Sequence, residues 1–345
     1  MRTARTHKLF SGKGRATEGT SDVVNEVKPP QPTPVEPVRP VTPSDLRSAT
    51  HRPHDTTASQ NSAEIYTDHF GLKTRPFALA PDPDFLFWPP AHRRAYTMLE
   101  YGVMTHSPIT LITGDIGAGK TTLLLHLMRS LGPDVCVGLI SNPNGARSEL
   151  LRWVLMALDE PVGLNESYVD LFQRFQSVLI REYARGRRVV LIFDEAQNLS
   201  SEALEELRMF TNINTGRDEL LQLVLVGQPE LRDAVSQPSM RQFAQRVAAN
   251  YHLTAMDQRT VRAYVAHRMK VAGSETNVFT RPAVDLIFRT TGGVPRLVNQ
   301  LCDLSLVYAF SKGRSSVTTA TVQRVLDDGV FFAVNALPAR DDMPA

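Results

Sequence analysis

The stretch GDIGAGKTT, residues 114–122, combines residue types that bind phosphate, and its spacing satisfies the pattern GxxxxGK[ST] in full. Glycines allow a turn so tight that successive backbone N–H groups face one anion. Lys120 would reach the β- and γ-phosphates of a nucleotide, and the Thr121 hydroxyl would ligate Mg²⁺. The alternative is a glycine turn with an exposed lysine. The pattern favours a phosphate-binding loop made of Gly114, Asp115, Ile116, Gly117, Ala118, Gly119, Lys120, Thr121 and Thr122.

A second candidate site ends the apolar run VVLIF (189–193), which is followed by Asp194 and Glu195. A buried strand that ends in two acids is typical of the metal and water site of a nucleotide hydrolase. Asp194 would hold the Mg²⁺ shell, and Glu195 would polarise the attacking water. The alternative is a pair of solvated carboxylates at a strand end.

Gln228 follows another apolar run, LQLVLV (221–226), by two residues. Ligands of parallel α/β sheets bind where the carboxyl ends of the strands cluster. Gln228 would therefore orient the water or sense the γ-phosphate, unless it only caps its loop.

Three arginines are further candidates. Arg241 and Arg246 lie on a predicted helix that runs into a strand, from which an arginine can protrude toward a neighbouring subunit. Arg246, which is nearer the strand, is the first choice, and an ordinary surface arginine is the alternative. Arg296 begins the helix after TGGVP, where a cation opposes the helix dipole, so a compensating anion is expected. Nucleotide phosphates would serve, and a salt bridge within the helical region is the alternative.

The elements that position these residues follow from short apolar runs at 109–113, 135–140, 189–193, 221–226 and 247–253. Runs that are apolar throughout indicate strands buried on both faces, as in a parallel sheet covered by helices. Helical patterns occupy about 91–104, 120–131, 147–158, 166–185, 201–213 and 229–246. The predicted fold class is a three-layer α/β domain.

After Met256 the strand patterns stop, and four helical patterns follow, at 257–272, 280–290, 294–311 and 317–330. We therefore expect an α/β domain over 64–255, a helical domain over 256–332 and a flexible tail over 333–345. Residues 1–63 are expected to be a disordered extension, because their proline-rich stretch offers few large apolar side chains to bury.

Composition excludes several classes of protein. The formal charge is +2, from 38 basic and 36 acidic residues, which gives no footprint of a nucleic-acid wrapper or a membrane-surface protein. Two isolated cysteines make neither a disulfide framework nor a metal cage. No apolar run reaches the roughly 18–20 residues that span a bilayer, and no secretory signal is evident. We expect a cytoplasmic protein, held at the inner membrane if at all through partners.

Taken together, these motifs resemble the AAA+ ATPases, and in particular the secretion-type branch. The stretches that carry the resemblance are FGLKTRPFALAPDPDFLFWPPAHRRAYTMLEYGV, GDIGAGKTT, FDEAQNLS, LVGQPEL, QRVAANYHL and GGVPRLVNQLCD, in family order between about residues 65 and 332. That branch includes the A component of general (type II) secretion and relatives encoded with pilus or exopolysaccharide loci.

The resemblance implies a five-stranded parallel sheet with a helical lid, ATP and Mg²⁺ as ligands, and assembly into a homo-oligomer. It implies sensor 1 at Gln228, sensor 2 at Arg296 and an adenine-flanking segment over 70–90, and it leaves the trans-acting arginine open between Arg241 and Arg246. The type II secretion member continues beyond its ATPase half into a membrane span and a cell-wall module. Since few residues follow the lid here, the exopolysaccharide- and pilus-associated relatives are the closer parallel.

The leading hypothesis is a Mg²⁺-dependent ATPase that drives or regulates assembly of a bacterial envelope export system, with an export-machine protein as partner. One alternative is a DNA-associated AAA+ regulator of the transposition target-selection type, disfavoured by the absence of a helix-turn-helix after the lid. Another is a nucleotide-gated scaffold with slow turnover.

Overall fold

The computed structural model describes residues 65–80, 85, 87–143, 147–163, 165–214 and 218–332. The predicted extension over 1–63 and the predicted tail over 333–345 lie outside the described residues.

A single five-stranded sheet forms the centre of the α/β region, with the strand order β2-β3-β4-β1-β5 and every pairing parallel. Along β3, Val189, Leu191 and Phe193 pack on one face of the sheet, and Val190 and Ile192 pack on the other. Both faces are covered, which is why the strands are apolar throughout. The predicted parallel sheet is confirmed, and its strands are β1 (Ile109–Gly114), β2 (Val135–Ser141), β3 (Arg188–Asp194), β4 (Leu221–Gly227) and β5 (Val247–Leu253).

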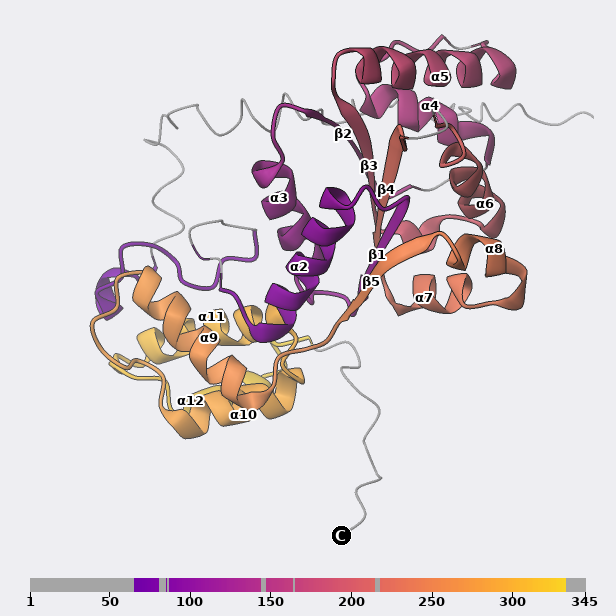
Figure 1. The fold of residues 1–345 in the computed structure, drawn as a ribbon. Helices are drawn as coiled ribbons and strands as arrows, with labels where there is room; N and C mark the ends of the chain where they lie inside the picture. Colours follow the sequence, from indigo (N-terminus) through magenta and orange to yellow (C-terminus); the bar gives the residue numbers. More distant parts are fainter. Residues whose placement is uncertain are drawn as a thin grey trace, which may run out of the picture. The chain divides into compact units, whose positions relative to one another are not determined.

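Helices cover the sheet as two layers (Figure 1). One face packs against α2 (Pro90–Met104) and α3 (Lys120–Ser130). The helices against the other face are α4 (Arg147–Ala157), α5 (Tyr168–Ala184), α6 (Ser201–Phe210), α7 (Pro229–Val235) and α8 (Arg241–Ala244).

The prediction of one helix over 229–246 is wrong. The chain forms α7, a 3₁₀ turn η6 (Pro238–Met240) and the short α8 instead. Pro238 explains the break, because a proline disfavours the helical conformation of the residue before it. Gln237 accordingly has extended backbone angles, φ −65° and ψ 147°.

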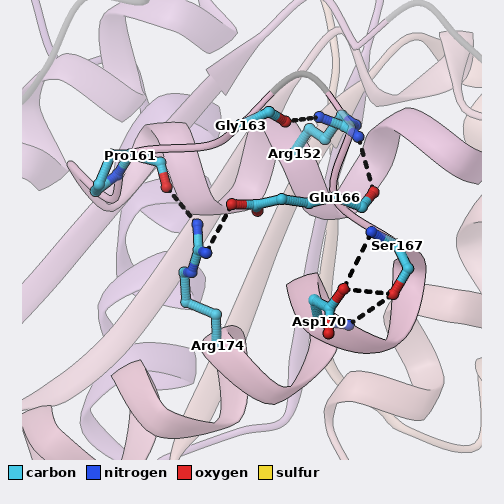
Figure 2. A network of polar contacts seen from close by, with 7 residues as sticks. All are labelled: Arg152, Pro161, Gly163, Glu166, Ser167, Asp170 and Arg174. Atoms are coloured by element: carbon cyan, nitrogen blue, oxygen red, sulfur yellow. Dashed lines mark hydrogen bonds and ion pairs between the residues drawn. The ribbon is translucent and has the colours of Figure 1, made fainter.

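Two arginines hold the loop between α4 and α5 (Figure 2). Arg152 donates to the carbonyl oxygens of Gly163, at 2.7 Å, and Glu166, at 3.1 Å. Arg174 donates to the carbonyl oxygen of Pro161, at 2.5 Å, and to the Glu166 carboxylate, at 2.7 Å. The loop carbonyls thus find donors although the loop has no ladder or helix of its own.

The region after Met256 is helical, as predicted, and none of the described helices in the chain is long and apolar enough to cross a membrane. Asp257 caps the first of these helices, since its carboxylate accepts a hydrogen bond from the Thr260 N–H at 2.7 Å. The helices are α9 (Gln258–Val271), α10 (Arg281–Thr291), α11 (Pro295–Ser311) and α12 (Thr319–Asp327), which we call the lid.

The N-terminal segment, residues 65–80, packs into the apolar core of the lid. Tyr66, Phe70 and Phe77 belong to the same buried cluster as the lid helices, and a short 3₁₀ helix η3 (Asp68–Phe70) lies within this segment. Asp303 on α11 accepts hydrogen bonds from the Tyr66 hydroxyl and from Arg75, the latter at 2.6 Å. The lid core is therefore built from two stretches of chain that lie on either side of the α/β region in sequence.

Candidate nucleotide-binding site

A cavity of about 350 Å³ lies between the loop after β1, the chain before and within α2, and the lid. Each of these parts contributes chemistry of a different kind. The loop and the start of α3 contribute Gly117, Gly119, Lys120, Thr121 and Thr122, the sheet edge contributes Glu195, and the lid contributes Tyr264, Arg268, Arg296 and Asn299.

The loop requires glycine at two positions. Gly117 and Gly119 have φ values of 77° and 98°, which L-residues with side chains rarely adopt. A Cβ on Gly117 would also lie 2.7 Å from the Cβ of Arg296, so the lid approaches this backbone closely. Gly119 lies at the N-terminus of α3 with no side-chain cap, which leaves the first N–H groups of the helix for an anion.

Lys120 is held inside the loop. Its Nζ donates to the carbonyl oxygens of Gly114, at 2.7 Å, and Asp115, at 3.0 Å, and its side chain is buried. Burial lowers the pKa of Lys120, and the nearby Glu195 and Asp194 carboxylates oppose that change. A buried ammonium hydrogen-bonded only to neutral carbonyls is matched to an anionic ligand.

Thr121 and Asp194, the two residues predicted to ligate a metal, lie side by side. The Thr121 hydroxyl donates to one Asp194 oxygen at 2.9 Å, and the other oxygen accepts the Glu195 N–H at 3.0 Å. Burial raises the pKa of Asp194, and the hydrogen bonds from Thr121 and Glu195 lower it in part. A hydroxyl and a carboxylate are hard oxygen donors, so these residues fit Mg²⁺.

Glu195 and Gln228, which are 33 residues apart in the chain, meet at the carboxyl edge of the sheet. The Gln228 amide donates to Glu195 Oε2 at 3.2 Å. Glu195 has a φ of 57°, an unusual conformation for a residue that is not glycine and a common sign of a functional turn. Gln197 also donates to Glu195 Oε2, at 2.6 Å, and sequence reasoning missed this residue.

Arg296 lies in the first turn of α11 and lines the cavity with Lys120. Its backbone N–H donates to the Gly117 carbonyl at 3.2 Å, which ties the lid to the phosphate-binding loop. Its exposed side chain forms no ion pair with any residue that the structure describes. Arg296 thus lies beside the phosphate-binding loop, and its role toward phosphate stays a prediction.

Arg241 and Arg246 do not line the cavity. Arg246 donates to the Thr211 carbonyl, at 3.2 Å, to the Thr211 hydroxyl, at 3.0 Å, and to Asn212, so it binds the C-terminus of α6. Arg241 is exposed on α8, and its side chain has no hydrogen bond or ion pair within the described part of the chain.

His92 is a further residue that the sequence did not single out. From α2 its Nε2 reaches the Ala118 carbonyl of the phosphate-binding loop at 2.8 Å. Burial lowers the pKa of His92, which favours the neutral ring that donates from Nε2. Only the fold brings α2 to the loop, so no local sequence signal could have found this contact.

The other end of the cavity combines rings with a buried cation. Arg268 lies 4.9 Å above the Phe85 ring and donates to the Pro76 carbonyl at 2.5 Å and to the Tyr264 hydroxyl at 2.8 Å. Tyr264 in turn donates to Asn299 at 2.7 Å. Aromatic rings beside amide and guanidinium groups are suited to a planar heterocycle, and the adenine-flanking segment predicted over 70–90 contributes Phe85 and Phe87 here.

Comparisons with known proteins bear on the family and the fold. A family model described as an AAA domain matches residues 103–235. General secretion pathway protein A of Aeromonas hydrophila is 38% identical over 253 residues, or 73% of this chain. The match covers 46% of that protein, so this chain spans about half the length of its curated relative.

Two solved structures share the fold. Drosophila ORC bound to DNA matches 84% of this chain and 73% of its own with a TM-score of 0.60 and 17% identity. Cdc6p from Pyrobaculum aerophilum matches 75% of each chain with a TM-score of 0.57 and 18% identity. Sheet, lid and loop together define an AAA+ P-loop nucleotide-binding fold. Within it, the chain belongs to the branch that resembles general secretion pathway protein A.

Proposed function

We propose that this chain binds ATP with Mg²⁺ and hydrolyses it. The observation that carries the proposal is the arrangement at the sheet edge, where Lys120 and Thr121 begin α3 and Asp194 ends β3. Asp194 accepts a hydrogen bond from Thr121, and the next residue, Glu195, accepts one from Gln228. A phosphate-binding loop with a purely structural role would not require the Glu195 carboxylate, or Gln228 hydrogen-bonded to it.

The side chains divide the work as follows. Lys120 and the N–H groups of residues 117–122 bind the β- and γ-phosphates. Glu195 accepts the proton of the attacking water, and Gln228 orients that carboxylate or the water. Thr121 and Asp194 would hold Mg²⁺, which when bound neutralises phosphate charge. Arg296 brings a lid cation to the phosphates.

Three aromatic rings and a guanidinium would surround the base in the same cavity. Phe85, Phe87 and Tyr264 offer apolar and aromatic surface, while Arg268 holds the N-terminal segment to α9. The lid and the phosphate-binding loop would therefore both contact one nucleotide, so its binding favours one lid position.

We further propose that the ATP-bound chain assembles into a homo-oligomer, with Arg241 as the arginine that reaches a neighbouring subunit's site. The Arg241 side chain is exposed and has no hydrogen bond or ion pair within the described residues, whereas the Arg246 side chain binds the C-terminus of α6. The relative's name places that protein in general secretion. We therefore propose assembly of an envelope export system as the process that this chain drives or regulates.

The test is phosphate release by the wild type, Lys120→Ala and Glu195→Gln, each with and without Mg²⁺. We expect Mg²⁺-dependent turnover in the wild type and a loss of at least about 100-fold in Glu195→Gln, the scale of a general base. ATP binding without any turnover at any protein concentration would favour the nucleotide-gated scaffold instead.

A further inference from the structure

Gln197 occupies an unusual position between two groups of the candidate site. It lies in the 3₁₀ turn η5 (Ala196–Asn198), which follows Glu195 directly. Its amide nitrogen donates to Glu195 Oε2 at 2.6 Å, and its carbonyl oxygen accepts the Gln228 backbone N–H at 3.0 Å. One side chain thus connects the end of β3 with the end of β4.

The orientation of this carboxamide is determined by its two partners. A backbone N–H can only donate and an ionised carboxylate can only accept. The Gln197 oxygen must therefore face Gln228, and the NH₂ must face Glu195. The opposite orientation would bring two acceptors together at Glu195 and two donors together at Gln228.

The chain also makes room for this contact. Gly227, at the end of β4, would place a Cβ 2.9 Å from the Gln197 oxygen and 3.2 Å from its backbone nitrogen. Glu195 meanwhile adopts its unusual φ of 57° directly before the turn. A close approach at Gly227 and an unusual backbone at Glu195 both converge on the place where Gln197 lies.

We infer that Gln197 is a positioning residue that holds the Glu195 carboxylate in register with Gln228 for attack of water on ATP. This inference rests on the proposed ATPase function. The NH₂ of Gln197 restrains Oε2 of Glu195, and its oxygen ties that restraint to the strand that carries Gln228. Its loss leaves the phosphate-binding groups in place and lets the carboxylate drift, which is expensive for a reacting group even at displacements near 1 Å.

The experiment compares Gln197→Leu and Gln197→Glu with the wild type, measuring ATP affinity and kcat separately. For Gln197→Leu we expect kcat to fall about 10- to 100-fold, with ATP affinity within about twofold. Gln197→Glu keeps the acceptor for the Gln228 N–H but puts a second carboxylate against Glu195. We expect kcat in Gln197→Glu to fall at least as far as in Gln197→Leu.

The order of the two variants separates positioning from a structural bracket. If Gln197 only tied the turn to β4, then Gln197→Glu would be the milder change, because it retains that bond. A kcat for Gln197→Glu near the wild-type value, or for Gln197→Leu at or above it, would overturn the inference while the proposed ATPase function stands. A wild type with no turnover would overturn both.

Gln222 provides the matched control. It is a buried glutamine on β4 whose amide lies within 3.2–3.4 Å of the carbonyl oxygens of Gly102, Val103 and Ser107, away from Glu195. Gln222→Leu loses a buried amide of the same kind, and we expect it to lower the thermal midpoint without changing the kcat of folded protein. A kcat loss in Gln222→Leu equal to that in Gln197→Leu would contradict the positioning role.

Discussion

Polar side chains have different surroundings at the carboxyl edge of the sheet and in the core of the lid. At the sheet edge, Lys120 is buried against neutral carbonyls and Glu195 has an unusual backbone conformation. In the lid, Asp303 accepts hydrogen bonds from Tyr66 and Arg75, and Tyr66 belongs to the apolar cluster of the lid core. The difference teaches that the edge is arranged for a ligand, whereas the lid core is arranged to hold two distant stretches of chain together.

The largest expected effect is a loss of stability when a large buried side chain is removed from the lid core. Phe77 is 1% exposed, and Phe77→Ala should lower the free energy of unfolding by about 3–5 kcal/mol through lost burial and a cavity. Urea unfolding measures this. Leu79→Ala in the same segment is the control, because Leu79 is 57% exposed and should change stability by less than about 0.5 kcal/mol.

Lys120→Ala should have the opposite outcome, a large loss of ATP affinity with little loss of stability. We expect ATP affinity to fall at least about 100-fold, since a charged partner of the phosphates is removed. The stability of the ligand-free protein should hardly change, because burial already lowers the pKa of this lysine and so opposes its charged form. Calorimetric titration with ATP and urea unfolding check both halves, with the exposed Lys312→Ala as control. Equal losses of stability and affinity would contradict the contrast between the two regions.

A smaller effect is expected where the N-terminal segment is attached to α11. Asp303→Asn weakens the bonds from Tyr66 and Arg75 and should lower the free energy of unfolding by about 1 kcal/mol, since Arg75 is partly exposed. Asp328→Asn weakens an exposed hydrogen bond from Tyr308, near the end of α11, and should cost less. Thermal unfolding of both variants tests this, and the opposite order would show that the segment is not held by Asp303.

The smallest effect concerns pH. Burial raises the pKa of Asp194, so its carboxylate takes up a proton at a higher pH than the usual value of about 3.9. The ionised form is the one that ligates a metal, so the advantage of Mg-ATP over metal-free ATP should shrink as pH falls through the raised pKa. Affinities measured from neutral to mildly acidic pH, with Mg²⁺ or with a chelator, check this. An advantage that stays constant would exclude Asp194 as the titrating ligand.

Much of the sheet edge could be predicted because its chemistry lies next to strand ends in the sequence. The loop over 114–122, Asp194, Glu195 and Gln228 each begin within two residues of the end of an apolar run, and parallel strands bring such positions together. The five strands followed from short runs that are apolar throughout, and the lid helices followed from helical patterns.

The remaining contacts could not be predicted because they depend on how the chain packs in three dimensions. Tyr66 meets Asp303 across 237 residues, and His92 meets Ala118 only because α2 packs beside the loop. Glutamine is common on protein surfaces, so the sequence does not distinguish Gln197, and its role appears only when β4 lies beside it. The prediction of a single helix over 229–246 failed because Pro238 disfavours the helical conformation of Gln237, although the rest of the pattern is helical.

The most direct test of the central claim is the identity of the nucleotide that stays bound after one turnover. Radiolabelled ATP would be incubated with an excess of wild-type protein or of Glu195→Gln in the presence of Mg²⁺, and the bound label would be separated and resolved. We predict ADP on the wild type and intact ATP on Glu195→Gln, whose phosphate-binding groups are unchanged. Intact ATP on both proteins, or ADP formed at the same rate on both, would contradict the assignment of Glu195 as the hydrolytic residue of this site.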